Sequence, residues 1–163
     1  MEFDEGILNM VKMVKGLLTQ RKETLTSCES LTGGLFGAAV CSVSGASDFY
    51  KGGVITYCDD AKERVGVTHE TLEKHTAISG ECAQEMALSA SRFIGADWAV
   101  SFTGNAGPTA QDDAPVGLVY IAVFYKGQAR AFRFNLEGDR NTVRTESVRE
   151  GLRLLLKALA DQA

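Results

Sequence analysis

The sequence has few of the residues that metal sites and disulfide frameworks require. Its 163 residues include two histidines, His69 and His75, and four cysteines that form no C-x-x-C pair. A structural zinc site needs four such ligands at short spacing, so we expect no metal. We expect the cysteines to be reduced, mostly buried thiols in a cytoplasmic protein. They are Cys28, Cys41, Cys58 and Cys82.

The chain also lacks a long apolar run and an excess of basic residues. No apolar stretch is long enough to span a bilayer, and the first residues, MEFDEG, are acidic where a secretory signal would be basic. The formal net charge is −4, with both signs mixed along the chain. Because nucleic-acid binding needs a basic face, we expect no nucleic-acid partner and no membrane partner.

What is present is the composition of an ordinary globular domain. Apolar residues make up 45% of the sequence and charged residues 23%. A length of 163 residues suits one domain with a substantial core. No repeat, linker or low-complexity tract divides the chain, so we expect residues 1–163 to form a single domain.

Hydrophobic periodicity predicts helices that alternate with strands. The predicted strands are residues 24–28, 53–57, 99–103, 117–125 and 129–135, the last two forming a hairpin around Lys126-Gly127. Helices are predicted over residues 7–18, 33–43 and 140–160, and Gly45 ends the second of these. Two short helices are predicted after the capping residues Asp59-Asp60 and Thr68. A longer helix is predicted after the cap Ser79, with Phe93 on its buried face. This order predicts an α/β fold with a mixed, mostly parallel sheet and helices on both faces.

Three polar turns follow predicted strand ends, at residues 29–34, 57–62 and 103–108. Parallel strands end at one edge of a sheet, and open α/β sheets bind ligands there, so we expect these turns to meet. The known phosphate and nucleophile motifs are missing from them: there is no Walker loop, dinucleotide fingerprint, nucleophile elbow or S-x-x-K. Neither histidine lies near a strand end, so the sequence offers no histidine for a Ser-His-Asp triad at this edge.

Ser30 in the first turn and Lys62 after the second are a candidate nucleophile and base. A hydroxyl is a weak nucleophile until a neighbouring base takes its proton. We place Lys62 in the first turn of a helix, where burial and the positive end of the helix dipole both favour its neutral amine. Tyr57 could orient this lysine or relay a proton. The alternatives are a capping or turn role for Ser30 and a solvated surface position for Lys62.

Other groups near the same edge could bind an anion. The segment Thr32-Gly33-Gly34 could present backbone N–H groups to a phosphate or an oxyanion at a helix N-terminus, or could simply pack the helix against the strand. Arg140 and Arg144 lie four apart on one helical face and could grip a phosphate. The alternative for these two is that they are solvated surface arginines.

Six ordered motifs resemble those of the CinA C-terminal domain family, and the resemblance extends over nearly the whole chain, from about residue 5 to 160. They are Glu29-Ser-Leu-Thr-Gly-Gly34, Val54-Ile-Thr-Tyr57 with Ala61-Lys62, His75-Thr-Ala-Ile-Ser79, Thr103-Gly-Asn-Ala-Gly-Pro108, Pro115-Val-Gly117 and Gly138-Asp-Arg140. The resemblance implies a three-layer α/β/α domain, often a homodimer. It also implies a stand-alone form, without the additional N-terminal domain of longer members.

The best-known activity of this family is the deamidation of nicotinamide mononucleotide. The pyridine carboxamide is hydrolysed to the acid and ammonia in pyridine-nucleotide salvage, by a Ser-Lys dyad with no metal or cofactor. The resemblance implies Ser30 as nucleophile, Lys62 as general base and Tyr57 as an assisting residue. The implied partner is a small-molecule nucleotide, contacted by residues drawn from Glu29, Thr32, Gly33, Gly34, Thr103, Gly104, Arg140 and Arg144.

Three departures from the family pattern bear on these expectations. Leu31 replaces the signature cysteine, which we interpret as a packing change, and Asn105 replaces a usual isoleucine. The segment 109–114 reads TAQDDA where the family has an aspartate, two glycines and a lysine. If this loop touches an anionic nucleotide, affinity should drop. Two further hypotheses are therefore kept: hydrolysis of another small amide, and a non-catalytic nucleotide-binding or protein-interaction module.

Overall fold

The computed structural model describes residues 2–111 and 113–162. Met1 and Ala163, the ends of the expected domain, and Asp112, in the 109–114 loop, lie outside the described residues. The strands are β1 (Leu25–Glu29), β2 (Tyr50–Ile55), β3 (Trp98–Gly104), β4 (Leu118–Tyr125) and β5 (Gln128–Asn135). The helices are α1 (Glu5–Arg21), α2 (Leu35–Cys41), the 3-10 helix η1 (Ala46–Asp48), α3 (Asp59–Val65), α4 (His69–His75), α5 (Gly80–Ile94) and α6 (Arg140–Asp161).

The sheet is mixed, as the alternation of helices and strands predicts. Its strand order is β2-β1-β3-β4-β5. β1 pairs in parallel with β2 and with β3, whereas β4 is antiparallel to both β3 and β5. Since β5 reverses direction again, four of the five strands run the same way. The predicted hairpin around Lys126-Gly127 is the β4–β5 pair.

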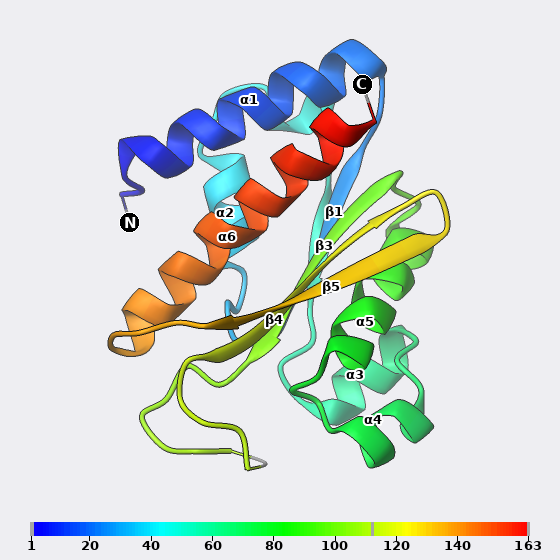
Figure 1. Ribbon diagram of the computed structural model, residues 1–163. Helices are drawn as coiled ribbons and strands as arrows, with labels where there is room; N and C mark the ends of the chain where they lie inside the picture. Colours follow the sequence, from blue (N-terminus) through cyan, green and yellow to red (C-terminus); the bar gives the residue numbers. More distant parts are fainter. Residues whose placement is uncertain (1, 112, 163) are drawn as a thin grey trace.

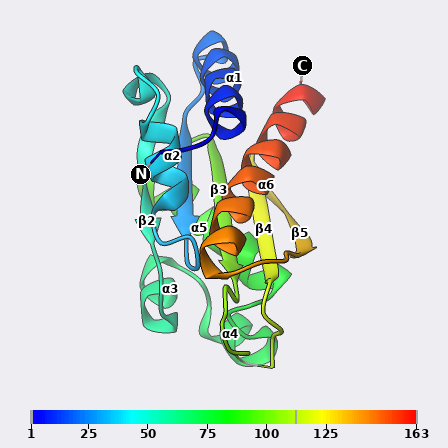
Figure 2. The same cartoon turned by 90° about the vertical axis from the view of Figure 1, so that its left-hand side faces the viewer.

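Helices cover both faces of this sheet and produce three layers (Figures 1 and 2). α1, α2 and α6 lie on one face, where their apolar side chains join those of β1, β3 and β4 in the largest core cluster. α5 covers the other face, with α3 and α4 packed beside it. The family fold expected from the sequence motifs is therefore confirmed.

The packing of α5 differs in one detail from the periodic pattern of its sequence. Phe93 was expected on the buried face, but its side chain is 68% exposed. The buried stripe instead runs from Ala83 through Ala87 to Ser91 in steps of four residues. The Ser91 hydroxyl donates to the Ala96 carbonyl, 2.6 Å away, and so holds the turn that follows α5.

Several predicted boundaries shift, most of them by a few residues. β2 begins at Tyr50 and not at Gly53, because its pairing with β1 already starts at Tyr50, opposite Leu25. α2 ends at Cys41, well before Gly45. Asp59 opens α3, and its N-cap is Cys58. The caps predicted at Thr68 and Ser79 are confirmed, since each hydroxyl accepts a hydrogen bond from the backbone N–H three residues further along the chain.

Gly117 links the loop after β3 to the segment that follows β5. The Gly117 N–H donates to the Asn105 carbonyl, and the Gly117 carbonyl accepts from Leu136, both at 2.8 Å. A Cβ at this position would lie 1.9 Å from the Leu136 carbonyl oxygen, and φ is +88°. Both the backbone conformation and the close approach therefore require glycine here.

We predict that Gly117→Ala destabilises the protein far more than its matched control, Gly127→Ala. Gly127 has a similar φ of +83° but open space around it. The control should lose about 1–2 kcal/mol for left-handed backbone alone. Gly117→Ala should lose about 3 kcal/mol more because the methyl group collides with Leu136. Urea unfolding of both variants measures the difference, and equal losses would contradict the collision.

Candidate active site

The carboxyl ends of β1, β2 and β3 are aligned by the register of the sheet. Glu29, the last residue of β1, lies opposite Ile55 of β2 and Phe102 of β3. Just beyond, the Ser30 N–H donates to Phe102 and the Thr56 N–H to Glu29, both at 2.9 Å. The three polar turns therefore leave the sheet at one edge, which confirms the arrangement expected from the sequence.

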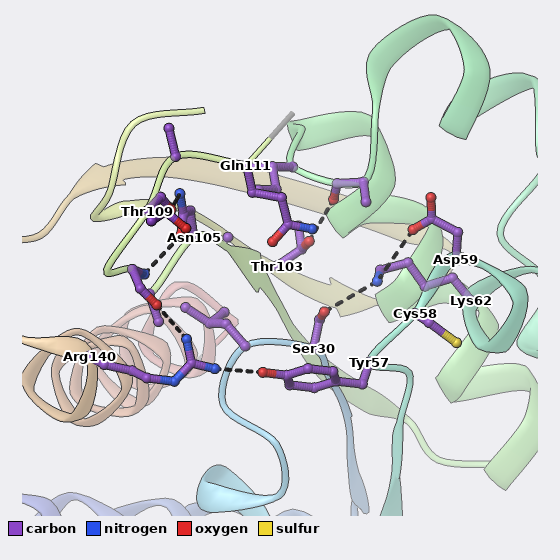
Figure 3. A pocket seen from close by; sticks show the side chains of 17 residues that line it. Ser30, Tyr57, Cys58, Asp59, Lys62, Thr103, Asn105, Thr109, Gln111 and Arg140 are labelled. Atoms are coloured by element: carbon purple, nitrogen blue, oxygen red, sulfur yellow. Dashed lines mark hydrogen bonds and ion pairs between the residues drawn. The ribbon is translucent and has the colours of Figure 1, made fainter. Parts of the chain in front are cut away.

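A cavity of about 630 Å³ lies at this edge. All three turns line it, together with the α4–α5 connection, the loop after β3 and the first residue of α6. Figure 3 shows the side chains that face it. The polar residues of interest are Ser30, Tyr57, Asp59, Lys62, Thr103 and Arg140.

Ser30 and Lys62 are in direct contact inside the cavity. The Lys62 Nζ donates to the Ser30 Oγ at 3.2 Å. Both residues are buried, with 2% of Lys62 and 8% of Ser30 exposed. Lys62 is the fourth residue of α3, at the end of the first helical turn. A solvated surface position for this lysine is therefore wrong, and the amine lies where it can exchange a proton with the serine hydroxyl.

Tyr57 does not contact this pair, contrary to the role expected for it. Its side chain is 58% exposed, and its hydroxyl accepts from the Arg140 guanidinium at 2.7 Å. The same guanidinium donates to the Gly107 carbonyl at 2.5 Å. In Figure 3 the phenol points toward Arg140 and away from Lys62. Tyr57 and Arg140 thus link two turns across the side of the cavity.

Thr103 and Gly104 line the cavity at the end of β3. The Thr103 hydroxyl donates to the Ala77 carbonyl at 2.5 Å, so its oxygen remains able to accept a hydrogen bond from a ligand. A Cβ on Gly104 would lie 2.6 Å from the Leu118 carbonyl oxygen. Gly104 is therefore required by the close approach of β4, whatever contact it makes with a ligand.

The predicted anion cradle at the start of α2 is already filled by the protein. The Glu29 carboxylate accepts from the N–H groups of Gly34, Phe36 and Gly37 at 2.9–3.0 Å. The Gly33 N–H donates to the Ser30 carbonyl. Glu29 is 2% exposed and does not line the cavity. It neutralises the helix N-terminus from within, and two of the N–H groups assigned to a substrate anion, those of Gly33 and Gly34, are therefore in use.

Arg144 is also placed differently from the prediction. It was paired with Arg140 as a phosphate contact, but its guanidinium donates to the carbonyls of Leu31 and Thr32 at 3.1 and 2.9 Å. Arg140 lines the cavity and Arg144 does not. Arg144 thus holds the turn that carries Ser30, and only Arg140 is available to a ligand in the cavity.

Asn105 is a functional residue that the sequence motifs did not assign. Its side chain is buried and accepts from the Gly107 N–H at 2.8 Å. Its amide donates to the carbonyls of Thr109 and Ala114 at 2.9 and 3.1 Å. The signal was the polar residue itself, an asparagine where the family resemblance implies an isoleucine. Asn105 fixes the loop that carries Gln111, another residue facing the cavity.

The four cysteines are all free thiols. Cys28 and Cys82 are buried, whereas Cys41 and Cys58 are exposed, so the expectation of mostly buried thiols holds for half of them. Among residues 2–111 and 113–162, no three His, Cys, Asp or Glu side chains are grouped so as to hold a metal ion. Within the same part of the chain, no helix has the length and apolar character needed to cross a membrane.

Comparison with known proteins places the chain in a family. The profile of the CinA C-terminal domain matches residues 8–159. A CinA-like protein of Thermotoga maritima is 43% identical over 152 residues, which are 92% of this chain and 37% of that protein. A putative competence-damage inducible protein of Bacillus subtilis is 38% identical, over 93% of this chain and 36% of that protein. The chain thus spans little more than a third of these curated relatives.

Solved structures of similar length show the same fold. A CinA superfamily protein from Klebsiella pneumoniae superposes with a TM-score of 0.92 at 36% identity, covering 95% of this chain and 98% of that one. The competence/damage inducible protein CihA from Agrobacterium tumefaciens gives 0.93 at 32% identity, covering 98% and 99%. The chain belongs to the CinA C-terminal domain family, as its six motifs indicated.

We predict that Glu29→Gln destabilises the protein, because Glu29 supports α2 and does not face the cavity. An amide would place its NH₂ group against backbone N–H donors, so the loss should be about 2–4 kcal/mol. The matched control is Glu5→Gln, an exposed carboxylate in the first turn of α1. Thermal and urea unfolding measure both. A stable Glu29→Gln protein with weakened ligand binding would instead support the substrate-side role assigned to Glu29 from the motifs.

Proposed function

We propose that this chain is an amidohydrolase that deamidates nicotinamide mononucleotide to nicotinate mononucleotide and ammonia. The observation that carries the proposal is the contact between the Lys62 amine and the Ser30 hydroxyl at 3.2 Å, inside a cavity at the carboxyl edge of the sheet. A buried lysine beside a serine is the arrangement that an activated hydroxyl nucleophile needs. The choice of substrate rests on the resemblance of the sequence motifs to those of the family, and the product would enter pyridine-nucleotide salvage.

The first half of the reaction forms an acyl-enzyme. The Ser30 Oγ attacks the carboxamide carbon, while Lys62 takes the hydroxyl proton and becomes an ammonium. The Leu31 N–H donates to no described residue and lines the cavity next to Ser30, so it is available to the oxyanion. When the C–N bond breaks, the Lys62 ammonium gives its proton to the leaving nitrogen, and ammonia departs.

The second half of the reaction restores the enzyme. A water molecule attacks the ester carbon, and the neutral Lys62 amine takes a proton from it. The bond between this carbon and the Ser30 Oγ breaks, and the serine oxygen recovers a proton from Lys62. One carboxamide and one water thus give one acid and one ammonia. Neutral Lys62 and protonated Ser30 are regenerated.

The cavity has groups suited to both ends of the substrate. The Thr103 oxygen can accept a hydrogen bond from the carboxamide NH₂, since its own proton goes to Ala77. Arg140 is exposed beside the cavity and is suited to a phosphate, because a guanidinium can donate two parallel hydrogen bonds to it. The exposed ring of Tyr57, tied to Arg140, offers an aromatic face for a pyridine or ribose.

A second candidate is the hydrolysis of a less anionic small amide. Among the described residues that line the cavity, Lys62 and Arg140 are the only cations, and the 109–114 loop, in which the family pattern implies a lysine, contributes Gln111. If Lys62 performs the chemistry, Arg140 alone remains for a phosphate. This favours an amide with less negative charge than a mononucleotide. A non-catalytic binding module remains the alternative from a different class.

We predict that wild-type protein releases ammonia from nicotinamide mononucleotide and that Ser30→Ala and Lys62→Met lower kcat by about 10³-fold or more. The matched control is Lys12→Met, an exposed lysine of α1, which should keep wild-type activity. Ammonia is measured by a coupled assay and nicotinate mononucleotide by chromatography. Activity that survives in Ser30→Ala would exclude the serine as nucleophile, and binding without turnover in wild type would favour the non-catalytic module.

We predict that Arg140→Met separates the two candidate substrates. If Arg140 binds the phosphate, the KM for nicotinamide mononucleotide should rise about 10–100-fold, by the loss of a charged hydrogen bond. The KM for nicotinamide riboside, which has no phosphate, should change little. Steady-state kinetics on both substrates provide the measurement. A wild-type preference for the riboside, with no effect of Arg140→Met, would favour the less anionic amide.

A further inference from the structure

Besides the neutral Ser30 hydroxyl, Lys62 has one charged neighbour. The Asp59 carboxylate lies 3.9 Å from the Lys62 Nζ and also lines the cavity. In Figure 3 the contacts to Ser30 and to Asp59 leave the amine in different directions. A distance of 3.9 Å is an ion-pair contact and too long for a hydrogen bond. Asp59 can therefore stabilise positive charge on the amine without taking its proton.

Two thiols near the amine are uncharged at neutral pH. Cys28 of β1 and Cys82 of α5 both lie behind Lys62, and burial raises the pKa of their thiols to about 11 and about 12, against the opposite influence of Lys62. Glu29, at the end of β1, is held by the N–H groups of α2. Among the described residues, Asp59 is the only carboxylate within 4.0 Å of the Lys62 amine.

We propose that Asp59 is the positioning residue of the dyad and holds Lys62 in its ammonium form after this lysine has taken the Ser30 proton. The inference rests on the roles proposed for Ser30 and Lys62, and it does not depend on which amide is the substrate. When Ser30 becomes part of an ester, it no longer anchors the lysine as before. The carboxylate then keeps the amine directed toward the leaving nitrogen, which must receive the proton.

The Asp59 carboxylate also acts on the Lys62 amine before the reaction begins, and this effect can be measured. A carboxylate near an amine favours the ammonium form, so its removal makes the neutral base easier to form. Removing the carboxylate should therefore produce two opposite changes. Activity should begin at lower pH, because the neutral amine forms more readily. The maximum rate should nevertheless fall, because the ammonium formed during the reaction has lost its partner.

The chain offers a matched control in the next residue. Asp60 is also a carboxylate in the first turn of α3, but it pairs with Arg64 at 2.8 Å, and both side chains are more than 70% exposed. Asp59→Asn and Asp60→Asn therefore change the same residue type and the same charge in the same helical turn. They differ in whether the lost carboxylate faces Lys62.

The experiment follows the labelling of Ser30 by phenylmethylsulfonyl fluoride as a function of pH. In this step the Ser30 Oγ bonds to sulfur, fluoride leaves, and Lys62 takes the hydroxyl proton. We expect the midpoint of labelling rate against pH in Asp59→Asn to lie roughly half to one pH unit below wild type, a small shift because Asp59 is largely exposed. With nicotinamide mononucleotide, kcat should fall about 3–10-fold, the rate equivalent of that pH shift, and KM should stay nearly constant. Asp60→Asn should match wild type in all respects.

The outcomes distinguish this inference from the proposed function. Partial misfolding of Asp59→Asn would lower the amount of labelled protein but leave the midpoint in place. A midpoint and a maximum rate equal to those of Asp60→Asn would overturn the role of Asp59 alone. Labelled Ser30 without ammonia release from nicotinamide mononucleotide would overturn only the substrate. A wild-type protein that is not labelled at Ser30 would overturn both the dyad and the role of Asp59.

Discussion

The site depends on one constraint, the common end of three parallel strands. β1, β2 and β3 stop within two residues of one another in the ladder, so the turns that follow them must leave the sheet side by side. The proposed nucleophile comes from the first turn, the proposed base from the helix after the second, and the Thr103 hydroxyl from the third. No long connection or flexible segment is needed to bring Ser30 within 3.2 Å of Lys62.

Of the charged side chains described around this edge, only Lys62 is hydrogen-bonded to the Ser30 hydroxyl. The Glu29 carboxylate is turned inward and neutralises the N-terminus of α2, which keeps it out of the cavity. Arg144 is bound to the carbonyls of the nucleophile turn. Arg140 stays at the cavity but is linked to Tyr57. What remains next to Lys62 is one hydroxyl and one more distant carboxylate, a set suited to moving a proton and holding the resulting charge.

The sequence predicts the fold and the meeting of Ser30 and Lys62 at one edge of the sheet, because both depend on local pattern and strand order. Periodicity gives the helices and strands, and the shared edge follows from parallel pairing. It does not predict the partners of Tyr57 and Arg144, because side chains of this length can reach several carbonyls or hydroxyls. Glu29 was misassigned for a related reason: a carboxylate before a helix can face a ligand or turn back to cap the helix, and sequence alone does not choose.

The most direct measurement of the central claim is to trap the covalent intermediate. Wild-type protein is mixed with nicotinamide mononucleotide, quenched in acid within the first turnover, digested, and analysed by mass spectrometry. The account predicts that the peptide containing Ser30 gains the nicotinate mononucleotide acyl group and that the adduct decays as acid product forms. Product formation with Ser30 unmodified at every time point, or an adduct on another residue, would contradict it.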